Sequence, residues 1–74
     1  MEYMKRIVSD PDIMLGKPIV KGTRITVELI LRKISEGMTI KELLESYPHL
    51  TREDILAAIS YSADVIAKEE LIAP

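Results

Sequence analysis

Apolar side chains recur every three or four residues over the second half of the chain, which is the spacing of one face of an α-helix. Residues 27–36 show this pattern first, and residues 40–47 repeat it. A third set begins after Thr51 and continues to about Glu69. The pattern therefore predicts three helices, of which the last is the longest.

Residues that start and end helices lie at the borders of these segments. Thr26 precedes the first segment as an N-cap, and Gly37 follows it where helices often end in a left-handed residue. Thr39 and Thr51 each have an acidic residue three positions later. This is the spacing of a capping box, in which hydroxyl and carboxylate accept free backbone N–H groups. Pro48 ends the second segment, because the residue before a proline avoids the helical conformation.

The first 25 residues contain prolines and glycines too close together for a long helix. Two short β-prone pieces, residues 6–8 and 19–20, lie between these turn residues and predict extended strands. We expect Gly22 at a turn position with positive φ. The run from Gly16 to Thr23 lacks the Gly-Lys-Ser/Thr ending of a nucleotide-binding loop. A β-hairpin or turn with basic residues on its rim is the favoured interpretation.

These segments make one mainly α domain over residues 1–74, with strands and turns over 1–25, three helices over 26–69 and a tail over 70–74. The second helix, a short break and a longer third helix have the layout of a helix-turn-helix, and the first helix completes a three-helix bundle. This layout alone does not identify a DNA-binding protein, because many small three-helix domains share it.

Composition adds an expectation about oligomeric state. A chain of 74 residues buries a modest share of its surface, and this one has no cysteine for a disulfide. Its hydrophobic content is nevertheless 47%, and such chains often complete their core with a second copy. We therefore expect a homodimer. The sequence has neither a signal-peptide core nor an apolar run near the roughly 20 residues that span a bilayer, so we expect a cytoplasmic protein without a membrane partner.

The formal net charge of −2 argues against indiscriminate binding to nucleic acid, but the charges are uneven. Residues 1–24 have five basic and three acidic side chains, whereas residues 25–74 have five basic and nine acidic ones. The basic start indicates either a phosphate-facing end or ordinary surface scatter. Candidate DNA contacts come from the starts of the second and third helices and from the first segment: Lys41, Thr51, Arg52, Lys17, Lys21 and Arg24. The alternative for each is a solvated surface side chain.

The third helix is apolar or small on more than one side, so we expect the other helices to cover one side and a second chain or a partner to cover another. Candidate interface residues are Leu56, Ala57, Ser60, Ala63, Leu71 and Ile72. For the last two, a segment that docks in a partner's groove and a frayed terminus are both open interpretations.

No catalytic set is recognisable, so we expect no enzymatic activity. Cysteine is absent, and His49 is the only histidine. The acidic pairs are explained by helix caps and exposed helix faces rather than by a pocket that perturbs their pKa values. A single turn histidine is far more often solvated than a base or a ligand. We also expect no metal, no cofactor and no small-molecule substrate.

Segments 7–11, 16–25, 47–51 and 54–61 together resemble the bacterial and archaeal family called domain of unknown function 433, and the resemblance covers about residues 6–67. The run Gly-Lys-Pro followed by Lys-Gly-Thr-Arg-Ile is its most specific part. The resemblance implies a homeodomain-like helix-turn-helix bundle with a short N-terminal β-element that tends to dimerise. The chain departs from the common form at Met14-Leu15-Gly16, where a Gly-Gly pair is usual, and at Thr26, where proline is frequent.

Many members of that family are regarded as antitoxins similar to the VapB type, encoded beside a PIN-like ribonuclease toxin. The resemblance therefore implies a small DNA-binding antitoxin that neutralises such a ribonuclease by contact and represses its own operon. Arg24 and the segment 68–72 are candidate inhibitory groups, because such a nuclease holds its metal with carboxylates. The alternative is a dimeric protein–protein interaction module without DNA binding, which the acidic helical half favours.

Overall fold

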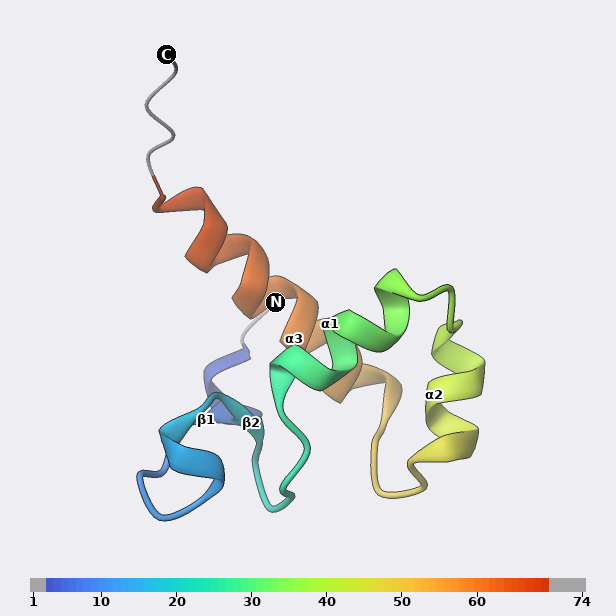
Figure 1. Ribbon diagram of the computed structural model, residues 1–74, viewed down its shortest axis with the longest axis horizontal. Coiled ribbons are helices and arrows are strands. Elements are labelled where there is room, and N and C mark those ends of the chain that lie inside the picture. The colour runs from blue at the N-terminus through green and yellow to red at the C-terminus, as the bar shows by residue number, and fades with distance from the viewer. Residues whose placement is uncertain (1–2, 70–74) are drawn as a thin grey trace.

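The computed structural model describes residues 3–69, and three helices dominate it (Figure 1). They are α1 (Val27–Ser35), α2 (Ile40–Ser46) and α3 (Arg52–Ala67). Two short strands, β1 (Ile7–Val8) and β2 (Ile19–Val20), precede them, together with the 3₁₀ helices η1 (Tyr3–Lys5) and η2 (Met14–Gly16). The predicted order of strands, turns and three helices is confirmed.

Each helix begins at the threonine that the sequence predicts. The Thr26 hydroxyl accepts a hydrogen bond of 3.0 Å from the backbone N–H of Leu29. Thr39 and Thr51 both form complete capping boxes with the acidic residue three positions later. Gly37 follows α1 with a φ of 98°, a conformation that costs little only for glycine. The local signals of the sequence therefore determine where the helices start and where α1 ends.

The N-terminal segment forms a small antiparallel sheet. Ile7 pairs with Val20 and Val8 with Ile19, and an isolated bridge joins Ile19 to Thr26. Strand β2 therefore has β1 on one edge and Thr26, the residue before α1, on the other. The turn after β2 has the predicted positive φ at Gly22, which is 81°.

The core lies where α1, α2 and α3 meet the sheet. Ile19, Ile30, Leu43 and Ile55 are its largest fully buried side chains, one from each of these elements. Two consecutive alanines of α3, Ala57 and Ala58, are also completely buried and allow close contact with the rest of the core.

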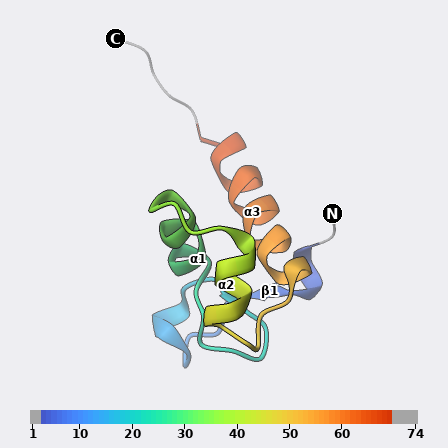
Figure 2. The same ribbon diagram turned by 90° about the vertical axis from the view of Figure 1, so that its right-hand side faces the viewer.

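Only the first half of α3 belongs to that core. Its second half extends away from the rest of the molecule in both views (Figures 1 and 2). The one aromatic contact there is an edge-to-face pair between Tyr3 and Tyr61, with ring centroids 5.4 Å apart. The neighbouring Asp64 carboxylate raises the pKa of Tyr3. Helix η1 therefore packs against Tyr61 on one side of this second half of α3.

Candidate macromolecule-binding surfaces

The protruding half of α3 presents apolar side chains to solvent. Ile59 is 39% exposed, Val65 42% and Ile66 64%, and Ala63 is exposed between them. Residues 59, 63 and 66 follow one another at helical spacing, so they line one side of the helix, whereas Val65 lies roughly 100° or more around the helix from each of them, on the side of Tyr61. We call these four residues, Ile59, Ala63, Val65 and Ile66, the α3 apolar surface.

A groove lies between α1 and α3. Its volume is about 500 Å³, and Val65 lines it together with the apolar residues Pro18, Val27, Leu31 and Tyr61. Glu28, Arg32 and Ser35 complete the lining along α1. Val65 therefore lines the groove, while Ile59, Ala63 and Ile66 lie outside it on another side of α3.

The predicted interface residues only partly coincide with the α3 apolar surface. The prediction for Ala57 is wrong, because this residue is completely buried in the core and cannot contact a partner. Leu56 and Ser60 are half-buried and Ala63 is exposed, whereas Leu71 and Ile72 lie outside the described residues. Sequence reasoning did not select Val65 and Ile66. Their signal was available, since they are apolar residues in the last two turns of a helix much longer than its neighbours.

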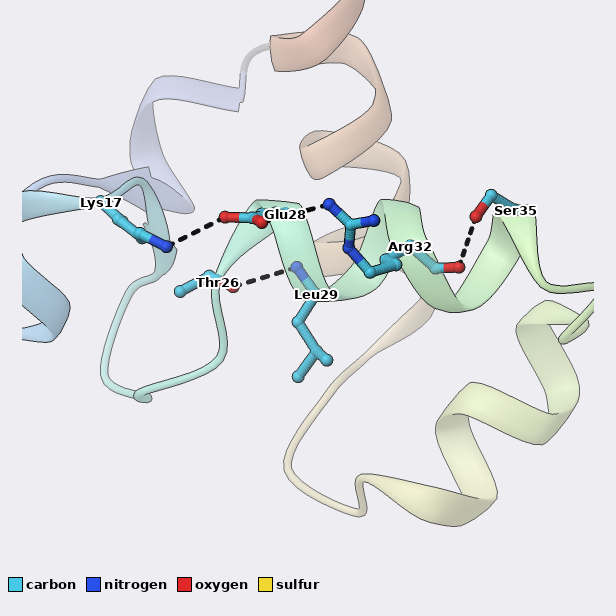
Figure 3. Close-up of polar contacts among 6 residues, drawn as sticks. All are labelled: Lys17, Thr26, Glu28, Leu29, Arg32 and Ser35. Carbon is cyan, nitrogen blue, oxygen red and sulfur yellow. Dashed lines mark hydrogen bonds and ion pairs between the residues drawn. The ribbon is translucent and has the colours of Figure 1, made fainter.

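Lys17, a predicted DNA contact, is part of an ion-pair chain on α1. Its ammonium lies 3.1 Å from one carboxylate oxygen of Glu28, and Arg32 lies 3.3 Å from the other (Figure 3). The hydrogen bond and charge of Lys17 lower the pKa of Glu28, and Arg32 adds to the effect. The Glu28 carboxylate therefore neutralises cations that would otherwise face a phosphate.

Lys21 and Arg24, two further predicted contacts, come together in a basic pocket. The pocket has a volume of about 570 Å³ and is lined by Lys21, Gly22, Thr23, Arg24, Ile25 and His49. His49 arrives from the α2–α3 turn, far away in the sequence. Its presence was missed because nothing in the sequence relates that turn to residues 21–25.

The predicted DNA contacts of the helix-turn-helix lie at helix starts. Lys41 and Arg52 are exposed in the first turns of α2 and α3, and the Thr51 hydroxyl accepts from the backbone N–H of Asp54 at 3.2 Å. Acidic side chains surround them. Residues 39–69 have three basic and six acidic side chains. Thr39 lowers the pKa of Glu42 by hydrogen bonds from its backbone N–H and its hydroxyl, so a carboxylate stands next to Lys41.

Within the described residues, no group of three or more histidine, cysteine or acidic side chains is arranged to hold a metal ion. Among those same residues there is also no helix whose length and hydropathy would let it cross a bilayer.

A family model and a solved structure name the same family, and two uncharacterised proteins are similar to this chain. The sequence model described as "Protein of unknown function (DUF433)" matches residues 7–62. An uncharacterised protein, y4eO of Sinorhizobium fredii, is 36% identical over 56 residues, which are 76% of this chain and 25% of that protein. An uncharacterised protein of Archaeoglobus fulgidus is 52% identical over 29 residues, which are 39% of this chain and 81% of that protein.

A solved structure agrees with these matches. It is the crystal structure of a DUF433 member protein from Anabaena variabilis, with a TM-score of 0.81 and 32% identity, over 88% of this chain and 64% of that one. This chain thus spans a quarter of the Sinorhizobium protein and less than two thirds of the Anabaena protein. The family match includes the basic pocket but ends before Val65 and Ile66.

Proposed function

This chain belongs to the DUF433 family of proteins of unknown function, and on that premise we propose that it is a protein-binding antitoxin that uses the α3 apolar surface. The observation that carries the proposal is the exposure of Ile59, Val65 and Ile66 on α3, the last two on the half that extends away from the core (Figure 1). The first partner to occupy this surface is a second copy of the chain.

Covering this surface favours association, and each side chain gains in proportion to the part of it that is exposed. Burying one isoleucine or valine side chain contributes about 1.5–3 kcal/mol. A helix in water is stabilised chiefly by covering its apolar face. The α3 apolar surface has three such large side chains, and Ala63 among them lets a second helix approach closely.

The antitoxin role rests on the family resemblance. A member of this kind binds a PIN-like ribonuclease and blocks it by direct contact, so the apolar area around α3 is the surface that such a nuclease would use. The interaction module without DNA binding remains the alternative, and it uses the same surface. Co-expression with the product of the neighbouring reading frame distinguishes the two, because only an antitoxin would suppress a ribonuclease activity of that product.

Operator binding is the second candidate function. The arrangement of α2 and α3, each started by a capping box, favours it. Lys41, Thr51 and Arg52 would face the duplex, and a dimer would double their number. The excess of acidic over basic residues in 39–69 opposes it. A titration with the upstream DNA at several salt concentrations tests it, since specific binding would weaken steeply with salt.

The dimer is tested by analytical ultracentrifugation of the wild type and of Ile66→Glu. We expect a wild-type dimer at micromolar concentration and a monomer for I66E, because each copy would bury a charge. Leu15→Glu is the matched control, since Leu15 is 93% exposed and lies in η2, away from the α3 apolar surface. L15E should dimerise like the wild type. A monomeric wild type, or an I66E protein that still dimerises, would contradict the proposal.

A further inference from the structure

The basic pocket is built by two turns that meet. One is the turn at residues 21–24 after β2, and the other is the α2–α3 turn that contains His49. In Figure 1 both turns lie at the lower edge of the molecule, below α1 and α2. The pocket is concave and does not include any residue of the α3 apolar surface, so it is independent of the proposed protein interface.

Its two cations are not neutralised. Residues 3–69 contain four ion pairs, and none of them involves Lys21 or Arg24. No acidic side chain lines the pocket. This distinguishes Lys21 and Arg24 from Lys17, whose charge Glu28 offsets. A histidine in the same pocket adds a further donor, and a further charge when it is protonated.

The backbone of the first turn adds donors of its own. Thr23 donates both its N–H and its hydroxyl to the carbonyl of Val20, and its Oγ accepts from the N–H of Ile25. The turn is therefore held in one conformation. The N–H groups of Gly22 and Arg24, in contrast, have no acceptor within residues 3–69. Backbone N–H groups that a turn leaves without an internal acceptor can donate to a bound anion.

We propose that this pocket binds the phosphate group of a small phosphorylated molecule. A guanidinium, an ammonium, an imidazole and two backbone N–H groups belong to residues that line one pocket, and so many donors suit a doubly charged group with three free oxygens better than a carboxylate. A pocket of about 570 Å³ is in the size range of small-ligand sites. Duplex DNA fits less well, because the adjacent helices α2 and α3 contain five acidic side chains, which repel phosphates.

The experiment is a titration of ¹⁵N-labelled protein with inorganic phosphate and with adenosine 5′-monophosphate, followed by the amide resonances. We expect saturable shifts of the Gly22 and Arg24 amides. Arg24→Gln should weaken binding about tenfold or more, because it removes a charge-assisted hydrogen bond. Lys5→Gln, which removes an exposed cation outside the pocket, should bind like the wild type.

Three results would overturn the proposal. The first is the absence of shifts at Gly22 and Arg24 with both phosphate probes. The second is an equal response to acetate, which would indicate a nonspecific anion effect. The third is binding of a short DNA duplex that is tighter than the monophosphate and lost in R24Q, which would assign the pocket to nucleic acid. A folded spectrum of R24Q confirms that a loss of binding is local.

Discussion

At the scale of single residues, the contact between Arg6 and Asp54 connects the two parts of the fold. The guanidinium beside β1 lies 3.0 Å from the carboxylate at the start of α3. The second oxygen of the same carboxylate accepts the backbone N–H of Thr51 at 3.0 Å, so Asp54 caps its helix and binds the sheet at once. The sequence predicts the cap from spacing, but the ion pair joins residues 48 positions apart and has no local signal.

Arg6→Ala should lower the free energy of unfolding by about 1–2 kcal/mol, because Asp54 is largely buried and would lose its charged partner. Chemical denaturation monitored by circular dichroism measures the change. Lys5→Ala is the matched control, since Lys5 is an exposed neighbouring cation without an ion pair in the described residues. Equal stability of R6A and K5A would show that the contact contributes nothing.

Glu28 gives a pH-dependent prediction. Because Lys17 and Arg32 lower its pKa in the folded protein, its ionised form stabilises the fold at a pH above the ordinary glutamate value. That stabilisation should disappear as the pH falls through the lowered pKa. Glu28→Gln should therefore be less stable than the wild type at neutral pH and equally stable in strong acid, as measured by thermal unfolding. Since the group is exposed, added salt should also reduce the difference. A difference that persists in acid would contradict the electrostatic explanation.

At the scale of elements, local rules explain the helices well and the segment before β2 poorly. The three threonine caps and Gly37 act within four residues, so the sequence alone predicts them. Helix η2 has no comparable signal. There Met14 and Leu15 have φ values of 49° and 59°, although neither is glycine. These residues occupy the place where the resemblance implies a Gly-Gly pair, and glycine would adopt such φ values without strain.

Leu15→Gly should therefore stabilise the protein slightly, by about 0.5 kcal/mol. Removing a left-handed leucine relieves about 1–2 kcal/mol of backbone strain, and the extra freedom of glycine in the unfolded chain offsets part of it. No contact is lost, because Leu15 is 93% exposed.

Gly37→Ala is the converse change and the control. Its new Cβ would meet nothing within 4 Å, yet its φ of 98° would strain an alanine, so stability should fall by about 1 kcal/mol. Thermal unfolding of both variants tests the pair, and changes of the same sign would refute the backbone explanation.

At the scale of the whole molecule, the sequence predicts the character of each helix better than it predicts how the helices pack together. That α3 would be apolar on several sides follows from its residues. Which side of α3 packs into the core does not follow from its residues. For this reason the sequence wrongly predicts the buried Ala57 at a partner interface. The basic pocket escapes prediction for the same reason, since its parts approach one another only after the sheet and the helices have assembled.

A dimer through the α3 apolar surface makes thermal stability depend on protein concentration. A tenfold dilution should lower the midpoint of unfolding by on the order of 5 °C, because dissociation accompanies unfolding. Differential scanning calorimetry at several concentrations measures the shift. The unfolding midpoint of I66E should not depend on protein concentration. A wild-type midpoint that does not change with concentration would indicate a monomer.

The protruding half of α3 also has a consequence for the lifetime of the protein. A helix half with few buried contacts opens more readily than the half that lies in the core, and proteases cleave opened segments. We expect its amide hydrogens to exchange faster than those of residues 54–58. A bound partner would protect this half, so a copy without its partner would be degraded first. Occupancy of the α3 apolar surface would thereby set how fast the protein is degraded.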